Sequence, residues 1–320
     1  MSEQVRAGGK GPNNQGSRKN AGKFVAWLAF KAFYGVVSIL PLCILFPAFH
    51  GLSAIFRAFG ARRRIVRVNL RASLGKELPE QELARIERNC YTEYGRILAE
   101  IFASTRLLKK KGQRFEFTGR EIADEAVNSG RGMLILTGHI GNFVAVAHYL
   151  RSIGFCLTFI AKRIANQYIN RDIEKVYGQN GNKVISVRSA RNDPEGGAKV
   201  FRAMKQGELV IALIDQDAGP EGTRTTFLGL PTYLPGGPVA LACRGGIPVT
   251  TGFVTREDGL IRIELNKPVD YSSAASTEEA VGIILDEYSK RLEEKVRKCP
   301  EQYFWFHKKW KTLPEIRAQY

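Results

Sequence analysis

The amino-acid sequence predicts an α/β protein with a mostly parallel central sheet flanked by helices, preceded by an N-terminal apolar helical segment. From about residue 113 onward, short apolar strands alternate with helix-like stretches, an order typical of parallel sheets. Near the N-terminus, 25 consecutive residues contain no Asp, Glu, Lys or Arg. We therefore expect a disordered basic tail over residues 1–22, a membrane anchor or interfacial helices over 23–60 and one folded domain over 61–320.

The amino-acid composition indicates a folded protein with an anionic partner and without a disulfide framework. The chain has 320 residues, of which 44% are hydrophobic and 25% charged, so it can bury a sizeable core. The net charge of +17 predicts an anionic partner: nucleic acid, an anionic membrane face or an acidic protein. Five scattered Cys without a CxxC pair argue against a disulfide framework or a zinc site.

The uncharged stretch from Ala32 to Phe56 is long enough as a helix to cross a hydrocarbon layer of about 30 Å. Pro41, Pro47 and Gly51 interrupt it, so a single span and two shorter interfacial helices both remain open. The Arg-rich run that follows contains no acid and predicts guanidinium groups against anionic headgroups on the cytoplasmic side. A buried helical hairpin followed by a solvated basic helix is the alternative.

The rest of the chain divides into helices and strands by hydrophobic period. Residues 61–110 carry an apolar stripe at three- and four-residue spacing and predict helix, with a start at Pro79. Buried strands are predicted near 115–117, 133–136, 157–160, 183–185, 209–214, 248–254 and 261–265. Helices are predicted over 143–153, 167–178, 196–206, 238–244 and 277–298.

The segment Gly138-His139-Ile140-Gly141-Asn142 lies where a predicted strand ends and a helix begins. Open α/β sheets place their sites at this end of the strands, and flanking glycines allow a ligand to approach the backbone. A histidine has a pKa near neutrality, so His139 is the candidate general base. A His that merely caps the helix is the structural alternative. His50, His148 and His307 lack this context and are expected to be structural or interfacial.

The segment around His139 resembles the active-site motif of the late acyltransferases of lipid A biosynthesis. These belong to the wider lysophospholipid and glycerol-phosphate acyltransferases. The resemblance begins with Thr137–Phe143 and extends, in order, over about residues 24 to 312. It includes the Arg-rich run 62–70, Lys162 to Asn166, Asp215-Gln216-Asp217, Phe227–Pro231, Pro238–Ile247 and Pro300–Trp310.

The resemblance implies a glycerol-phosphate acyltransferase-like fold and an acyltransferase domain over residues 61–320. His139 would deprotonate a hydroxyl of a lipid A precursor or related glycolipid, which attacks the thioester of acyl-acyl carrier protein or acyl-CoA. The implied partners are that thioester, an anionic glycolipid acceptor and the inner membrane, with the catalytic domain on the cytoplasmic face. No cofactor, metal or nucleic acid is expected, and the oligomeric state is open.

One residue departs from the family pattern. The family has an acid five residues after the His, and here that position is Val144. An orienting carboxylate stabilises the charged imidazole, so its loss is costly. Three explanations are open: Asp215 or Asp217 replaces the acid, His139 works alone at a lower rate, or the protein is a catalytically impaired lipid-binding homologue. A lysophospholipid acyltransferase is the further alternative.

The expected substrate-binding residues follow strand ends: Gly141, Asn142, Lys162, Arg163, Asn166, Asp215 and Asp217. Lys162 and Arg163 suit a phosphate on the acceptor lipid, although a solvated turn explains them equally well. Asp215 and Asp217 follow a long apolar strand and require partners if they are buried. Aromatic residues among lysines at 304–311 suit a membrane interface or core packing better than stacking on bases.

Overall fold

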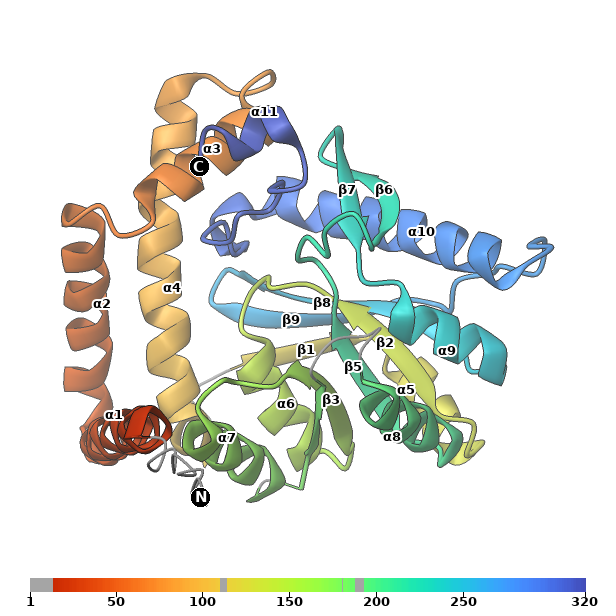
Figure 1. Cartoon of the computed structure of the whole chain (residues 1–320), viewed down its shortest axis with the longest axis horizontal. Helices are drawn as coiled ribbons and strands as arrows, with labels where there is room; N and C mark the ends of the chain where they lie inside the picture. The colour runs from red at the N-terminus through yellow and green to blue at the C-terminus, as the bar shows by residue number, and fades with distance from the viewer. Residues whose placement is uncertain (1–13, 110–113, 180, 188–192) are drawn as a thin grey trace, which may run out of the picture.

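The computed structural model describes residues 14–109, 114–179, 181–187 and 193–320, and its centre is a seven-stranded sheet (Figure 1). The strand order is β1-β9-β8-β2-β5-β3-β4. The strands are β1 (Arg114–Thr118), β2 (Met133–Thr137), β3 (Leu157–Lys162), β4 (Lys183–Val187), β5 (Leu209–Leu213), β8 (Val249–Glu257) and β9 (Leu260–Leu265). The pairs β8–β2, β2–β5, β5–β3 and β3–β4 are parallel, whereas β9 runs antiparallel to β8. The predicted α/β class with a mostly parallel sheet is therefore confirmed.

Both faces of the sheet are covered, because successive side chains of a strand point to opposite faces. Leu134 and Leu136 of β2 join a core cluster with α8 (Pro194–Lys205), α9 (Gly237–Gly245) and α10 (Thr277–Lys298). Met133 and Ile135 join a second cluster with α5 (Arg120–Asn128) and α6 (Phe143–Ser152). Helix α7 (Gln167–Gln179) connects β3 to β4. The chain then ends in the short helices η1 (Pro300–Gln302) and α11 (Pro314–Arg317).

Besides the short helices η1 and α11, two features of the central domain were absent from the sequence prediction. Helix α5 is short and carries only two buried alanines. The second feature is an antiparallel hairpin of β6 (Thr223–Phe227) and β7 (Leu230–Leu234). Its two-residue turn places Leu228 at φ 50° and Gly229 at φ 72°. Positive φ at both central residues gives the twist that a tight hairpin needs, but Leu is an unusual residue for it, so no turn motif marks this hairpin in the sequence.

Among the described residues, four helices precede the sheet: α1 (Asn14–Ile39), α2 (Leu42–Ala58), α3 (Arg63–Leu74) and α4 (Glu80–Lys109). The uncharged stretch is thus divided between α1 and α2, with the break before Pro41. The predicted helical region 61–110 is two helices, and the second begins directly after Pro79 as expected. Helix α2 runs beside α4, and α4 borders the sheet domain (Figure 1). Helix α1 begins inside the range expected as tail, and residues 1–13 lie outside the described residues.

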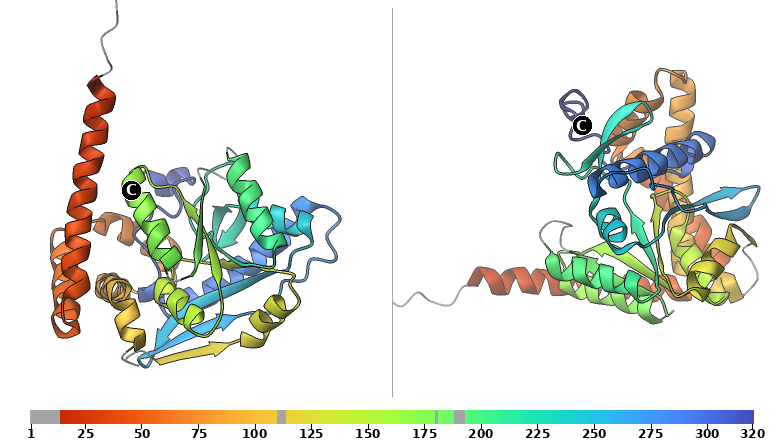
Figure 2. Two further views of the ribbon diagram at one scale, coloured as in Figure 1. Left: turned by 90° about the horizontal axis from the view of Figure 1, so that it is seen from below. Right: turned by 90° about the vertical axis from the view of Figure 1, so that its right-hand side faces the viewer.

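The amino-terminal part of α1 extends beyond the rest of the molecule (Figure 2), while the helix also contacts α7 and α4. Within the described residues, it alone is a single helix long and apolar enough to cross a membrane; the window Gly22–Ile39 is only 6% buried. Helices α2 and α3 qualify only as a pair bent by 81°. Exposed apolar side chains continue from α1 onto α2, including Val25, Val36, Ile39, Ile55 and Phe59.

The Arg-rich run departs from the expectation of guanidinium groups held against headgroups. Arg63 and Arg67 both form ion pairs with the buried carboxylate of Glu87, at 2.7 and 2.6 Å. Arg71 pairs with Glu80 at 2.8 Å. The acids that partner these arginines lie on α4, beyond the run itself, so the local sequence did not reveal the pairing. Three of the arginines therefore attach α3 to α4.

Candidate active site

His139 lies just beyond the carboxyl end of β2, in a tight turn that leads into α6. Gly141 has φ 60°, and a Cβ atom there would lie 2.2 Å from the carbonyl oxygen of Val254. Only glycine fits such a position without a backbone shift. Asn142 then caps α6, because its side-chain oxygen accepts a hydrogen bond from the Ala145 amide at 3.0 Å. Gly141 and Asn142 thus fix the path of the chain around His139.

The neighbouring strand β5 delivers a carboxylate to the His139 ring. In the β2–β5 register Thr137 lies opposite Leu213, so His139 and Asp215 each follow two residues beyond the same pair. His139 Nδ1 lies 2.6 Å from Asp215 Oδ1. The His139 side chain is 22% exposed, whereas that of Asp215 is only 4% exposed. The imidazole is accordingly reachable from solvent, and its partner is buried behind it.

The protonation of this pair follows from its surroundings. Burial raises the pKa of Asp215, but the charge and hydrogen bond of His139 and the charge of Lys309 lower it more, so it lies well below its usual range. Burial lowers the pKa of His139, while the charge and hydrogen bond of Asp215 raise it more, leaving it above 6.5. Because Asp215 is ionised, Nδ1 of His139 carries the hydrogen, and Nε2 of the neutral ring bears an unprotonated lone pair.

Nε2 of His139 faces the side chain of Gln216, which also contacts His307. The amide nitrogen of Gln216 lies 3.4 Å from His139 Nε2 and 3.0 Å from His307 Nε2. The two imidazole rings have centroids 6.1 Å apart. An amide NH₂ group has two hydrogens, so Gln216 can donate one to each ring nitrogen. This arrangement suits a neutral His139 whose Nε2 accepts a proton.

Lys309 supports the pair from the buried side. Its ammonium group donates a hydrogen bond to the main-chain oxygen of Asp215 and lies 4.6 Å from the centroid of the Phe227 ring. The residue is 4% exposed. Burial lowers its pKa to about 8, against the opposing charges of Asp215 and Asp217. A cation in this place stabilises the ionised form of Asp215.

Two residues expected to bind substrate make internal contacts. The Asn142 amide nitrogen donates to the buried Glu100 carboxylate at 2.9 Å, and Glu100 also pairs with Arg256. Asp217 accepts hydrogen bonds from the Gly219 amide at 2.7 Å and from the hydroxyl and amide of Thr312 at 2.7 and 2.9 Å. Both side chains thus hold segments of the chain around the site.

The basic residues after β3 lie farther along the same sheet edge, because β3 is the other neighbour of β5. Lys162 and Arg163 are exposed. Among the described residues, no hydrogen bond or ion pair joins either side chain to His139 or Asp215. Asn166 donates to the Lys23 carbonyl oxygen at 2.8 Å and accepts from the Tyr168 amide at 3.0 Å, so it connects α7 to α1.

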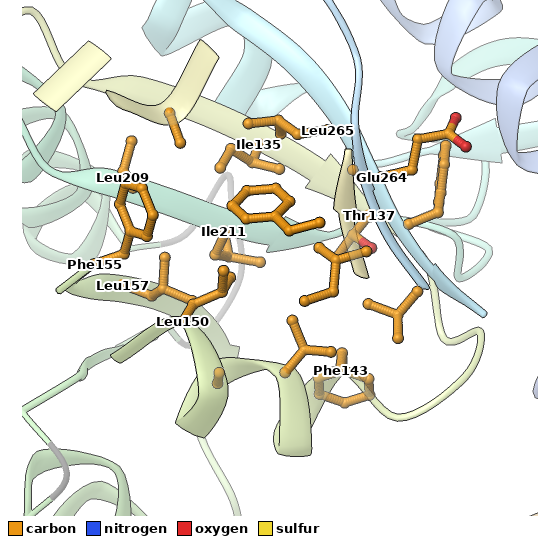
Figure 3. Close-up of a pocket in the computed structure, with 18 of the residues that line it drawn as sticks. Ile135, Thr137, Phe143, Leu150, Phe155, Leu157, Leu209, Ile211, Glu264 and Leu265 are labelled. Atoms are coloured by element: carbon orange, nitrogen blue, oxygen red, sulfur yellow. The ribbon is translucent and has the colours of Figure 1, made fainter. Parts of the chain in front are cut away.

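An apolar cavity of about 70 Å³ lies between α6 and the sheet (Figure 3). Its lining includes Ile135, Leu157, Leu209 and Ile211 from three strands. Phe143 lies at its edge, and the Phe143 ring is 5.9 Å from the His139 ring, centroid to centroid. The Phe143 side chain therefore lines the apolar cavity and is also a neighbour of the imidazole.

The described part of the chain holds no group of three or more His, Cys, Asp or Glu side chains placed to bind a metal ion. All five cysteines are free thiols.

Sequence reasoning missed three members of this site. Gln216 was overlooked between two acids, His307 was assigned a structural or interfacial role, and Lys309 was included only in an aromatic and basic stretch. The resemblance of Pro300–Trp310 to a family segment was the available signal. The spacing of that segment does not show that it folds back over the sheet, where the Phe304 amide donates to the His139 carbonyl oxygen at 2.9 Å.

Comparison with known proteins agrees with this chemistry. A family model described as bacterial lipid A biosynthesis acyltransferase matches residues 13–312. The chain is 25% identical over 308 residues to a lipid A biosynthesis palmitoleoyltransferase of Escherichia coli (strain K12), covering 91% of this chain and 90% of that protein. The same identity and coverage relate it to a lipid A biosynthesis acyltransferase of Shigella flexneri.

Proposed function

Because this chain belongs to the bacterial lipid A biosynthesis acyltransferase family, we propose that it transfers a fatty acyl chain from a thioester to a hydroxyl group of a lipid A precursor. The main observation that supports this proposal is the hydrogen bond between His139 and Asp215. It supports a neutral imidazole with Nε2 available as a general base, at the sheet edge where α/β enzymes bind their ligands.

The proposed reaction balances without a covalent enzyme intermediate. Nε2 of His139 takes the proton of the acceptor hydroxyl, and the oxygen attacks the thioester carbonyl carbon. Asp215 stabilises the imidazolium that forms. The tetrahedral intermediate then expels the thiolate, which receives the proton from His139, so the products are an ester and a free thiol.

The donor is proposed to be acyl-acyl carrier protein, with acyl-CoA as the alternative. The net charge of +17 favours docking of an acidic carrier. Lys162 and Arg163 are proposed to contact an anionic group of a substrate farther along the sheet edge. Gly141, Asn142, Asn166 and Asp217 are proposed to act by positioning the segments that frame the site.

Attachment to the cytoplasmic face of the inner membrane is proposed for helices α1 and α2. The support is the exposed apolar surface that both helices share. Such a surface in water is costly, and a bilayer covers it while bringing the acceptor lipid to the enzyme. The only support for the alternative of a non-catalytic lipid-binding homologue is Val144 in place of the family's acid. The contact of Asp215 with His139 Nδ1 removes the need for an acid at that position.

Purified protein in detergent micelles, given either thioester donor and a lipid A precursor, tests the proposal. The expected products are free thiol and an acceptor heavier by one acyl group, seen by mass spectrometry. His139→Ala should abolish both products. A folded wild-type protein that yields neither product with either donor would contradict the proposal.

A further inference from the structure

Helix α1 lies against the rest of the molecule with one of its two faces. Residues on that face recur at three- and four-residue spacing and are partly or fully buried. The opposite face consists of exposed residues at the same spacing, so the helix has an inner side and an outer side. The inner side is formed by Lys23, Trp27, Phe30, Tyr34 and Val37, and the outer side by Val25, Leu28, Ala32, Val36 and Ile39.

Helix α7 of the sheet domain holds the inner side near the middle of α1. Trp27 Nε1 donates a hydrogen bond to Asp172 Oδ2 at 2.7 Å, and Lys31 Nζ lies 3.7 Å from the same oxygen. The rings of Trp27 and Tyr168 are 5.8 Å apart, centroid to centroid. The Asp172 side chain is only 16% exposed. Lys31 lies close to the centre of the apolar window of α1, so a charged contact is located at the midpoint of that window.

Helix α4 holds the carboxyl-terminal end of α1. The ring of Phe102 lies 5.7 Å from that of Tyr34, centroid to centroid. Arg106 Nη1 donates to the Leu40 carbonyl oxygen at 2.5 Å. Together with the bond of Asn166 to the Lys23 carbonyl oxygen, these contacts extend over residues 23–40. That length is about 25 Å of helix, nearly the thickness of a hydrocarbon layer.

These contacts do not suit a helix that crosses a bilayer. In a spanning α1, the pair of Lys31 and Asp172 would lie near the bilayer centre, where charged groups are costly. Helix α7 would have to enter the hydrocarbon beside it, although Arg171, Asp172 and Glu174 lie within one turn of α7. The same contacts suit a helix that lies flat on a membrane surface, because only its outer side then meets lipid.

Helix α2 has a similar arrangement. It lies along the same side of the molecule as α1 and runs in a different direction (Figures 1 and 2). Its buried residues Leu45 and Phe49 belong to a cluster with residues of α4, whereas Ile44, Ile55 and Phe56 are more than half exposed. The exposed apolar side chains of both helices can contact one leaflet only if both helices lie in its plane.

The charge of the two helices indicates which surface covers them. Together α1 and α2 contain five Lys and Arg residues and no Asp or Glu. A basic surface of this kind favours an anionic lipid leaflet. A second copy of the chain is a poorer occupant, because two basic surfaces would then meet.

We propose that α1 does not cross the bilayer but lies in the interface of an anionic leaflet, with both of its ends on the side of the sheet domain. The outer sides of α1 and the exposed apolar residues of α2 contact the acyl chains of that leaflet. The inference rests on the proposed membrane attachment and adds the topology of the attachment.

Labelling from the two sides of the membrane tests this topology. Cys43 and Cys156, which are exposed, are replaced by serine, and the new cysteine is either Asn20→Cys, before the apolar window, or Ser273→Cys, in an exposed turn of the sheet domain. A maleimide that cannot cross membranes is applied to spheroplasts and to inverted inner-membrane vesicles. Both cysteines should react in the inverted vesicles and neither in spheroplasts. Reaction of the two cysteines from opposite sides would overturn the inference. Reaction of both in spheroplasts would keep the topology and contradict the cytoplasmic placement.

The depth of the outer side is measured with nitroxide labels on single cysteines at Val25, Leu28, Ala32 and Val36, in vesicles that contain phosphatidylglycerol. An interfacial helix should give similar ratios of oxygen to nickel-complex collisions at all four positions. A spanning helix would give a maximum at Leu28 and Ala32. Low access to both reagents would identify a second copy as the occupant, and high access to the nickel complex would leave the outer side in water. Each of these three results contradicts the inference.

Neither measurement requires acyl transfer, so both are repeated in His139→Ala. Equal thermal unfolding temperatures of each cysteine variant and its parent show that the variants are folded. Labelling of both cysteines from one side, with a wild type that transfers no acyl group, keeps the inference and removes the proposed function. Acyl transfer by a wild type in which α1 proves to be a span keeps the proposed function and removes the inference.

Discussion

Asp215 Oδ1 lies 2.6 Å from His139 Nδ1, although Val144 occupies the position where the family pattern has an acid. The acid of the pattern lies on the helix that follows the histidine, five residues along the chain. Asp215 instead comes from the adjacent strand β5, whose register with β2 brings residues 139 and 215 to the same edge. A carboxylate from another strand can orient the imidazole as well as one from the following helix, because the requirement is geometric.

The pH dependence of catalysis should reflect this pair. The pKa of His139 is raised, so the imidazolium persists above pH 6.5 and the free base is lost as the pH falls through that raised pKa. We expect kcat/KM to fall on the acidic side with an apparent pKa above 6.5. In Asp215→Asn the residual activity should show an apparent pKa lower than that of the wild type. A profile that is unchanged by the substitution would contradict the assignment.

Val144→Glu should bring no gain. Nδ1 of His139 has one hydrogen, which Asp215 already accepts, so a second carboxylate finds no donor there. We expect kcat/KM within about threefold of wild type, a change in barrier below about 1 kcal/mol. Val144→Gln, which is similar in size but uncharged, is the control. A tenfold increase for Val144→Glu alone would show that Asp215 does not meet the need for an orienting acid.

Asn142→Ala should lower stability more than it affects substrate binding. The substitution removes the cap of α6, worth about 0.5–2 kcal/mol, and takes a hydrogen bond from the buried Glu100. Thermal unfolding should occur at a lower temperature, while KM for donor and acceptor should stay close to the wild-type values. Asn142→Ser retains a capping oxygen and should lose less. A large rise in KM without loss of stability would show that Asn142 binds substrate directly.

Phe143→Ala should change the preference for acyl chain length. The ring lines the apolar cavity of about 70 Å³ and lies 5.9 Å from the His139 ring, centroid to centroid, so its removal should extend the cavity toward His139. Longer donors should gain about tenfold in kcat/KM relative to shorter ones, since one methylene in an apolar pocket is worth about 1–3 kcal/mol. Competition between thioesters of different lengths measures this ratio. Phe201→Ala, on α8 at the opposite face of the sheet, should leave the ratio unchanged.

The spacing of apolar residues along the sequence predicted those strands and helices in which apolar side chains recur at one regular interval. Apolar runs such as Met133–Thr137 and the stripe of Thr277–Lys298 give strong periodic signals, and both elements appear as expected. Helix α5 and the β6–β7 hairpin are short, and the hairpin turn has Leu228 where Asn or Asp is usual before Gly229, so the same reasoning missed them.

The residues of the site also fall into those that the sequence predicts and those that it does not. His139 is marked by its glycine neighbours and by the strand that precedes it. The pairing of His139 with Asp215 depends on the register of two strands far apart in sequence, so only the candidate acids could be named. His307 and Lys309 reach the site because the C-terminal segment returns over the sheet, where Thr312 donates hydrogen bonds to Asp217. The spacing of apolar residues within one segment gives no information about contacts between segments far apart in the sequence.

Single-turnover acyl transfer by Asp215→Asn, compared with wild type and His139→Ala at saturating substrate, tests the central claim most directly. Asn keeps the shape of the side chain but cannot stabilise an imidazolium, so we predict a rate lower by about 10³–10⁴, approaching that of His139→Ala. Asp217→Asn, at the neighbouring buried carboxylate that does not contact His139, should retain far more activity. A rate for Asp215→Asn within a few-fold of wild type would show that His139 does not depend on this carboxylate.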